Sequence, residues 1–260
     1  MLIAERHTRL KEMLSRRGMC DLETLAAELN VSQSTVRRDV EQMEQSGIVR
    51  RTHGGVIWVG DRVTGGSRPY AFDQRMGFQL DAKRLIAKAA RHLVQPGDTV
   101  LIDGGTTTFY LAQELHGQAM QLVTNSLPIA NLFLNEESVE LILAGGLMYP
   151  RYGVLLGPMA ENALSTIHTK TMFLSVAGIH TGMLYNQNML LVQAEQRMMA
   201  QSQQVVLLAD SSKFGQQALA QLCQLDQMDI VVSDSALATE HRDAVRAAGC
   251  ELIIAENGNP

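Results

Sequence analysis

Apolar residues in the first 60 positions recur at the three- and four-residue spacing of helices and then give way to two short β-type runs. This pattern predicts three helices and two strands, over residues 4–17, 22–29, 33–46, 48–52 and 56–59. Asp21 and Ser32 directly precede the second and third helices, where their side-chain oxygens can accept a hydrogen bond from an unpaired N–H of the first turn. Between the strands lies His53-Gly54-Gly55, which predicts a hairpin.

The third predicted helix has a single apolar stripe, because Val36, Val40 and Met43 fall at i, i+4 and i+7. With that stripe packed inward, the other faces present short polar side chains and two guanidinium groups. These are Gln33, Ser34, Thr35, Arg37 and Arg38. Such side chains suit base edges and phosphates. Three helices and a hairpin in this order therefore predict a winged helix-turn-helix whose third helix enters the major groove of DNA.

The hairpin would place Arg50, Arg51 and His53 along the phosphate backbone, although its glycines are also consistent with a plain turn. Arg38 has an alternative as well, because it could pair with a carboxylate of its own helix. We expect Asp39 to have a structural role of that kind and leave it out of the DNA contacts.

From about residue 81 onward, short continuous apolar runs alternate with helical stretches. The predicted strands span 99–102, 122–124, 139–143, 172–176, 205–209, 230–232 and 252–254. The helices between them include 109–115, 128–134, 158–166, 190–201 and 240–247. Continuous apolar strands joined by helical crossovers predict an α/β domain with a parallel sheet buried on both faces.

The pattern divides the chain into a winged-helix domain over residues 1–59, a linker over 60–80 and an α/β domain over 81–260. The net charge of −5 at first argues against a DNA-binding protein. Residues 1–59 have nine Lys and Arg against eight Asp and Glu, a net charge of +1, and the remaining residues have 13 against 19, a net charge of −6. The positive charges near DNA are therefore local, and the acidic remainder limits nonspecific binding.

Small, polar or cationic residues follow four of the predicted strands, and in a parallel sheet ligands bind beyond these carboxyl ends. After 99–102, Asp103 and two glycines lead into Thr106-Thr107-Thr108 at a helix start, where hydroxyl and N–H groups can bind an anion. Gly105 allows close backbone approach. The other candidates are Asn125, Arg151 and Lys213, the last as a counter-charge for the anion.

Each of these residues also has a structural alternative. The threonines could serve only as helix caps, and Asp103 could either accept hydrogen bonds from sugar hydroxyls or only hold its loop. Asn125 and Arg151 are equally open between a ligand and the fold. The methionine-rich helix with Met189, Met198 and Met199 is expected to provide packing or a subunit contact.

Composition restricts the remaining classes of function. Hydrophobic content of 46% with 19% charged residues is ordinary for a globular protein, and no apolar run approaches the ~18 residues of a membrane span. The start of the chain reaches charged residues too early for a signal peptide, so we expect a cytoplasmic protein. Cys20, Cys223 and Cys250 are isolated, which predicts reduced thiols, and we expect no metal site and no cofactor.

In these residues the chain resembles the DeoR family of bacterial transcriptional repressors over nearly its whole length. The N-terminal resemblance rests on Arg6, Leu10, the 22–29 helix, Val31-Ser32, Thr35-Val36-Arg37-Arg38-Asp39, Gly47, Arg51 and His53-Gly54-Gly55. The C-terminal resemblance rests on 103–108, 124–128, Gly145-Gly146, Gly157-Pro158 and 210–214. The resemblance implies a repressor of a carbohydrate-utilisation operon that a phosphorylated sugar or related metabolite releases from its operator. It also implies a sensor fold akin to ribose-5-phosphate isomerase.

The stretch 188–198 departs from many family members and is similar to the branch of the family that regulates ascorbate utilisation, which implies a sugar-acid or otherwise atypical effector. Because operators are commonly read by symmetric proteins, we expect a homo-oligomer, either a dimer or a tetramer. The alternative function is a sugar-phosphate isomerase with a DNA-binding extension, in which Asp103 or Asp210 would be the base. No further acid or base accompanies them in the predicted strand-end loops, so we expect no catalytic residues.

Overall fold

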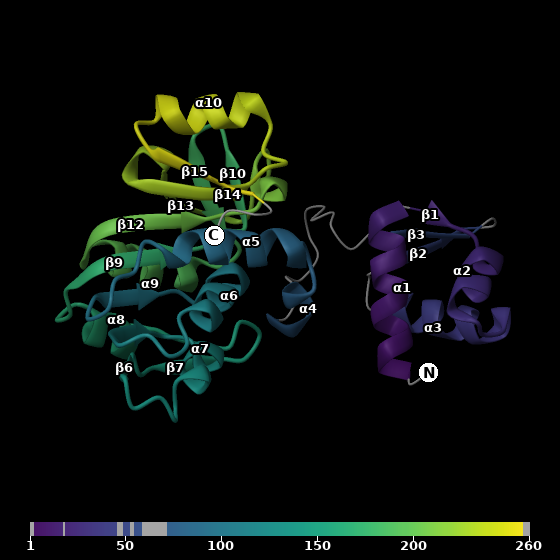
Figure 1. Cartoon of the computed structure of the whole chain (residues 1–260), viewed down its shortest axis with the longest axis horizontal. Helices are drawn as coiled ribbons and strands as arrows, with labels where there is room; N and C mark the ends of the chain where they lie inside the picture. Colours follow the sequence, from purple (N-terminus) through teal and green to yellow (C-terminus); the bar gives the residue numbers. More distant parts are fainter. Residues whose placement is uncertain (1–2, 18, 46–48, 53–54, 59–71, 257–260) are drawn as a thin grey trace. The chain divides into compact units, whose positions relative to one another are not determined.

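The computed structural model describes residues 3–17, 19–45, 49–52, 55–58 and 72–256, and the chain forms two compact units, Met1–Arg68 and Pro69–Pro260 (Figure 1). Most of the predicted linker, residues 60–71, lies outside the described residues. The last part of that range is helical, because Phe72–Met76 forms helix α4. No described helix combines the length and the apolar character that crossing a membrane requires.

The N-terminal unit contains three helices and a small antiparallel sheet, which confirms the predicted winged helix-turn-helix. The helices are α1 (Ile3–Arg17), α2 (Leu22–Leu29) and α3 (Gln33–Gln45). The strands are β1 (Met19–Cys20), β2 (Val49–Thr52) and β3 (Gly55–Trp58), in the order β1-β3-β2. Strand β1 was not predicted, because two residues are too few to show an alternating pattern.

The caps and the apolar stripe predicted for this unit are present. The Asp21 carboxylate accepts a hydrogen bond from the Thr24 N–H at 2.7 Å, and the Ser32 hydroxyl accepts one from the Thr35 N–H at 3.2 Å. Val36, Val40 and Met43 are fully or almost fully buried among residues of the other two helices and the sheet. Helix α3 is therefore fixed by its inner face, and its other faces remain open to solvent.

The C-terminal unit contains a seven-stranded parallel sheet with the order β15-β14-β12-β9-β4-β5-β6. All seven predicted strands belong to it. They are β4 (Thr99–Ile102), β5 (Met120–Thr124), β6 (Val139–Leu143), β9 (Thr169–Leu174), β12 (Ser202–Leu208), β14 (Ile230–Asp234) and β15 (Glu251–Ala255). The predicted α/β fold class is confirmed.

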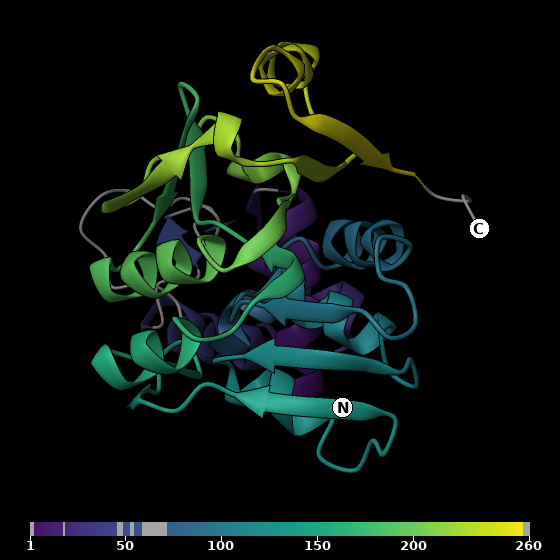
Figure 2. The same cartoon turned by 90° about the vertical axis from the view of Figure 1, so that its left-hand side faces the viewer.

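Helices cover both faces of this sheet, as Figure 2 shows for blue α5 on one side and green α8 and α9 on the other. One face packs against α5 (Leu80–Arg91), α6 (Thr106–Glu114) and α7 (Leu127–Leu132). The other packs against α8 (Pro158–Leu164), α9 (Met189–Met199) and α10 (Thr239–Ala247). The first core lies between the sheet and α5, α6 and α7, and the second lies between the sheet and α8, α9 and α10. Successive side chains of a strand alternate between them: Val100 and Ile102 lie in the first core and Leu101 lies in the second.

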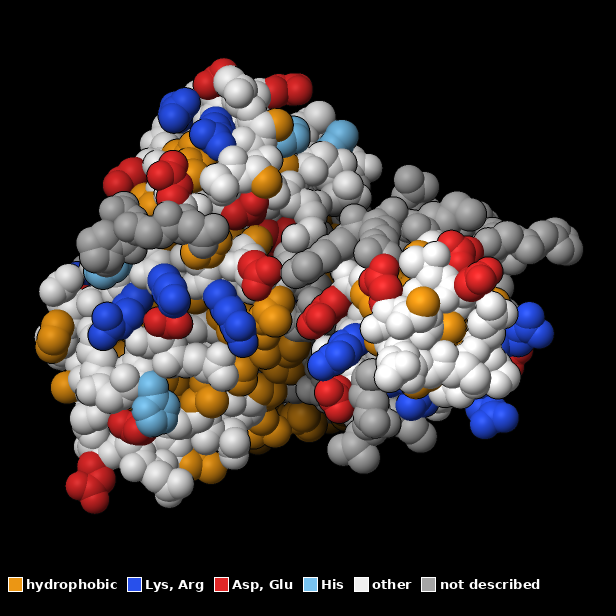
Figure 3. Space-filling view, turned by 45° about the vertical axis from the view of Figure 1, so that its right-hand side comes forward, with side chains coloured by type: hydrophobic (Ala, Val, Ile, Leu, Met, Phe, Trp, Pro, Cys, Tyr) orange, Lys and Arg blue, Asp and Glu red, His pale blue; other side chains and the backbone are white. Residues whose placement is uncertain are grey.

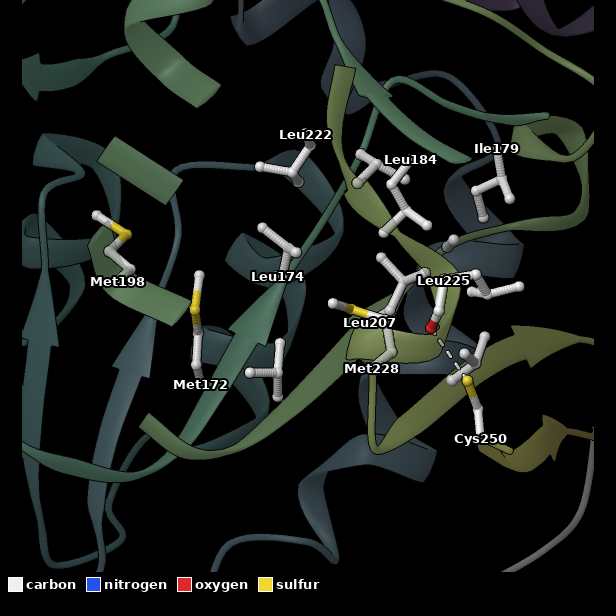
Figure 4. Packing of buried hydrophobic residues seen from close by; sticks show 14 of the residues in the cluster. Met172, Leu174, Ile179, Leu184, Met198, Leu207, Leu222, Leu225, Met228 and Cys250 are labelled. Carbon is white, nitrogen blue, oxygen red and sulfur yellow. Dashed lines mark hydrogen bonds between the residues drawn. The ribbon is translucent and has the colours of Figure 1, made fainter. Parts of the chain in front are cut away.

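Figure 4 shows part of the second core, where Met172 and Leu174 of β9 lie near Met198 and Leu207. This core continues under a second, antiparallel sheet that the sequence did not predict. Its strands are β10 (Gly178–His180), β11 (Met183–Asn186) and β13 (Ala220–Gln224), in the order β10-β11-β13. Also unpredicted are helix α5 and the hairpin of β7 (Leu147–Tyr149) and β8 (Val154–Leu156).

Candidate functional site

The outer faces of helix α3 present the residues that were predicted to contact DNA. Gln33, Ser34, Arg37 and Arg38 are exposed, and Thr35 is half-buried. The Ser34 and Thr35 hydroxyls each lie 2.8 Å from the Ser32 hydroxyl, so both take part in the cap of the helix. In the described part of the chain neither Arg37 nor Arg38 forms an ion pair, which leaves both guanidinium groups available to another molecule.

Asp39 has a structural role, as predicted, but its partners lie on α1 and not on its own helix. Its buried carboxylate accepts hydrogen bonds from Arg6, at 3.0 Å to Nη2, and from His7 Nε2 at 3.1 Å. Burial acts to raise the pKa of Asp39, but the hydrogen bonds from Arg6 and His7 outweigh it and hold the pKa below its usual value. Asp39 therefore ties α3 to α1.

The hairpin of the wing is described only in its backbone near the predicted contacts. Arg50 pairs with Ile57 and Arg51 with Val56 across the β2–β3 ladder. The side chains of Arg50 and Arg51 and the whole of His53 lie outside the described residues. Contact of the wing with phosphates therefore stays a prediction. On the face of the molecule that Figure 3 shows, blue Lys and Arg side chains are mixed with red Asp and Glu side chains, so the described residues visible there do not form a uniformly basic surface.

At the carboxyl end of β4, the Asp103 side chain organises the loop that leads into α6. One carboxylate oxygen accepts from the Gly105 N–H at 3.1 Å and from the Thr108 hydroxyl. The other accepts from the Ser175 N–H at 3.0 Å and from its hydroxyl at 3.2 Å, which joins the ends of β4 and β9. Burial raises the pKa of Asp103, although these hydrogen bonds act in the opposite direction. Of the two predicted roles, the contacts support that of holding the loop.

The three threonines begin helix α6 and are all buried. The Thr108 hydroxyl is bonded within the loop, whereas Gly105, the N-cap, has no side chain to cap the helix. First-turn N–H groups have no partner inside a helix. A Cβ on Gly105 would lie 1.7 Å from the Ser175 hydroxyl oxygen, so the close approach of the loop to β9 requires glycine here. The result is an N–H-rich helix start beside Thr106 and Thr107.

Asn125 and Arg151 reach the same edge from β5 and from the β7–β8 hairpin. The Asn125 amide donates to the Leu155 carbonyl oxygen at 3.0 Å, while its Oδ1 is buried without a hydrogen-bond partner. Arg151 Nε and the hydroxyl of the adjacent Tyr152 are also buried without partners. The Asn125 Nδ2 thus holds the hairpin, and its Oδ1 remains without a hydrogen-bond partner.

Two residues that the sequence interpretation missed complete this edge, and the first is Arg75 of α4. Its guanidinium lies over the Tyr152 ring, 4.6 Å from the centroid, and interacts electrostatically with Asp103 and Arg151. Nε and Nη2 are buried without partners, and burial lowers the pKa of Arg75. Phe72 and Met76, four residues apart in the range predicted as linker, were the available signal for a helix here.

The second missed residue is Glu195, on the inner face of α9. Its Oε1 accepts a hydrogen bond from the Asn186 amide at 2.7 Å, and its Oε2 is buried without a partner. Burial and the nearby Asp103 carboxylate raise the pKa of Glu195 to about 8, so the side chain is mostly neutral at pH 7. A glutamate within an otherwise apolar helical stripe was the only sequence signal for it.

Lys213 lies farther along the edge, in a short 3₁₀ helix (Ser211–Lys213) that follows β12. Strand β9 separates β12 from β4, and no described contact joins Lys213 to the 103–108 loop. The short helix that contains Lys213 is held by Asp234, whose carboxylate accepts a hydrogen bond from the Ser211 N–H at 2.6 Å. The structure therefore brings the other predicted effector residues close together and places Lys213 one strand away from them.

Buried polar atoms without a hydrogen-bond partner gather at this edge. Among the described residues, seven of the ten such side-chain atoms belong to Arg75, Asn125, Arg151, Tyr152, Glu195 and Asp210. Native proteins leave few buried polar groups unpaired, and a cluster of them indicates a missing partner. No group of three or more His, Cys, Asp or Glu among the described residues is arranged to hold a metal ion. The arrangement suits a polar, anionic organic ligand.

Comparison with known proteins assigns both units to one family. Residues 6–61 match the DeoR-like helix-turn-helix domain, and residues 79–235 match the DeoR C terminal sensor domain. Arg75 lies between the two matched segments. The transcriptional regulator UlaR of Shigella dysenteriae and that of Escherichia coli K12 are each 33% identical to the chain over 256 residues, covering 97% of the chain and 99% of the relative.

Among solved structures, ribose 5-phosphate isomerase A from Methanocaldococcus jannaschii is 18% identical, with a TM-score of 0.39 over 52% of this chain and 54% of that one. The eIF2B delta subunit from Chaetomium thermophilum is 13% identical, with a TM-score of 0.43 over 61% and 58%. The family matches and the full-length relatives show that the chain belongs to the DeoR family of helix-turn-helix transcriptional regulators.

Proposed function

We propose that this regulator represses a carbohydrate-utilisation operon and leaves its operator when a phosphorylated sugar or sugar acid binds the sensor unit. Operator DNA would be read by Gln33, Ser34, Thr35, Arg37 and Arg38 of α3, with Arg50, Arg51 and His53 of the wing on the phosphates. The observation that supports effector control is the cluster of unpaired buried polar atoms beside the start of α6.

The chemistry of the edge favours an anion at one end of the ligand and hydroxyl groups at the other. The start of α6 offers the N–H groups of Thr106 to Thr108 and the hydroxyls of Thr106 and Thr107, and Arg151 adds a positive charge. Asn125 Oδ1 and Asp210 Oδ2 are unpaired acceptors that suit sugar hydroxyls. The resemblance of 188–198 to the ascorbate-utilisation branch favours a sugar acid within this class.

Repression and release require that the effector bind the DNA-competent and DNA-incompetent states with unequal affinity. Because symmetric operators are read by symmetric proteins, the proposal includes a homo-oligomer, a dimer or a tetramer, in the cytoplasm. It does not include catalysis, because the relatives are named as transcriptional regulators and both Asp103 oxygens are engaged by the fold.

The test is a DNA-binding titration of the full chain on the promoter beside its own gene, with a panel of sugar phosphates and sugar acids. Release from DNA by at least one phosphorylated compound, and not by its dephosphorylated form, is the expected result. If no compound of either class changes DNA affinity, the proposed effector control is wrong. Product analysis of the same mixtures tests the isomerase alternative, since turnover of any compound would support it.

A further inference from the structure

We propose that Arg75 binds the anionic group of the effector and that this contact couples the occupancy of the site to the position of helix α4. The inference rests on the proposed function and assigns a residue that neither family match includes. Helix α4 is the first described element after Trp58, so it is where the chain enters the sensor unit. Residues 59–71 join the two units in sequence.

The charges around Arg75 leave room for an anion. Arg75 and Arg151 interact electrostatically with each other, and in the described part of the chain neither forms an ion pair. The nearby carboxylate of Asp103 is already engaged by Gly105, Thr108 and Ser175. Two guanidinium groups therefore share one occupied carboxylate, and two like charges at close range repel each other unless an anion neutralises them.

The unpaired atoms of Arg75 also have the geometry of an anion receptor. Nε and Nη2 lie on one side of a planar guanidinium and can donate two parallel hydrogen bonds to a phosphate or carboxylate. Stacking on Tyr152 at 4.6 Å, with the Phe72 ring 5.8 Å away, orients the group. The residue as a whole is half-buried, but Nε and Nη2 are themselves buried, so an anion reaches them only when neighbouring side chains move aside.

Helix α4 is attached to the site by contacts at both of its ends. The Phe72 N–H donates to the Arg151 carbonyl oxygen at 2.8 Å, and the Phe72 ring meets Phe109 of α6 edge-on at 5.6 Å. At the other end, the Tyr110 hydroxyl of α6 donates to the Met76 carbonyl oxygen at 3.2 Å. An anion held jointly by Arg75 and the start of α6 would fix α4 against α6.

The experiment uses hydrogen–deuterium exchange on the full chain, with inorganic phosphate as the probe and chloride at the same ionic strength as the reference. In the parent protein, phosphate should slow exchange both at the first turn of α6 and in Phe72–Met76. In Arg75→Ala, the α4 protection should be lost and phosphate affinity should fall about tenfold. Arg75→Lys keeps the charge without the fork and should fall in between.

The matched control is Arg84→Ala. Like Arg75, Arg84 lies over a tyrosine ring, that of Tyr110 in α6 at 5.9 Å from the centroid, but Arg84 is exposed. It should leave both protections and the affinity unchanged, and thermal melting checks that every variant folds. Protection of α6 without α4 in the parent, or unchanged affinity in Arg75→Ala, would overturn the inference alone. Protection at neither element would overturn the proposed anion site and the inference with it.

Discussion

The candidate DNA-reading face and the candidate effector site are built in opposite ways. On α3 the polar side chains come from one run of six residues, 33–38, and those predicted to contact DNA are exposed or half-buried. At the carboxyl edge of the large sheet they come from α4, three strand-end loops, the β7–β8 hairpin and α9, and several of their polar atoms are buried without partners. The first site needs one stable helix, whereas the second needs most of the sensor fold.

This difference has an energetic side. A buried polar atom without a partner costs about 1–3 kcal/mol, whereas water satisfies the exposed side chains of α3. A ligand that pairs with the unpaired atoms at the edge of the sensor sheet should therefore raise the stability of the sensor unit. The stability of the DNA-reading unit should depend instead on its core and on the hydrogen bonds that join Asp39 to α1. Four substitutions test this contrast.

Asp39→Ala should have the largest effect, a loss of about 3–5 kcal/mol in the free energy of unfolding of the N-terminal unit, because it leaves the Arg6 guanidinium buried and unpaired. The only tryptophan of the chain, Trp58, lies in β3 of this unit, so its fluorescence during urea unfolding reports the loss. Glu5→Ala is the control, because it breaks an exposed pair with Arg9 and should cost at most about 0.5 kcal/mol. Equal losses in the two variants would contradict the structural role of Asp39.

Glu195→Gln should stabilise the sensor unit, by an amount that grows with pH. The folded protein holds the Glu195 proton up to a pKa of about 8, while the unfolded chain releases it near 4.5. Between these values the folded state binds more protons, so the stability of the parent protein falls as the pH rises. Glutamine carries no charge and avoids that loss. From pH 5 to pH 8 the advantage of the variant should grow by about 3 kcal/mol.

Denaturant unfolding at several pH values measures this difference, and Glu161→Gln on neighbouring α8 is the matched control for the loss of a carboxylate. A pH-independent difference between Glu195→Gln and the parent would mean that the Glu195 carboxyl is ionised in the fold at neutral pH. In that case the effector site would be more acidic than described, and an anionic ligand would be disfavoured.

Arg38→Ala should leave both units folded and abolish operator binding at physiological salt, with a loss of roughly 1–3 kcal/mol for each copy that contacts DNA. Because Arg38 is exposed and unpaired in the described part of the chain, the melting temperature of the Arg38→Ala variant should match that of the parent protein. Arg9→Ala, which removes an exposed arginine of α1, is the control. Unchanged operator affinity in Arg38→Ala would refute the assignment of α3 as the recognition helix.

The predictability of the two units reflects the same contrast. All seven strands of the large sheet and the three helices of the winged helix-turn-helix were predicted, because buried strands and amphipathic helices repeat a local pattern. The small antiparallel sheet was missed because its strands mix polar with apolar residues and are defined by pairing between distant segments. Helix α4, with five residues, was too short for its spacing to stand out.

For the sites, the α3 residues were found together since they adjoin in sequence, and their contacts with DNA stay a prediction. The effector edge was found in part, through the polar residues directly after each strand. Arg75 and Glu195 were missed because they lie on helices, and only folding brings them beside Asp103. No local pattern signals that a helical glutamate will be buried next to a carboxylate 92 positions earlier in the chain.

Lys213→Ala should have the smallest effect and sharpens the boundary of the effector site. It is expected to leave operator binding unchanged and to weaken the response to effector about fivefold, as the loss of one partly solvated charge contact would. Effector titration of the DNA complex measures it, and Lys170→Ala near the amino end of β9, where Lys170 pairs with Asp98 at 2.7 Å, is the control. A response that matches the parent would place the anion wholly between α4 and α6. A loss as large as that of Arg75→Ala would instead show that the ligand spans β4, β9 and β12, because strand β9 separates Lys213 from the Asp103 loop.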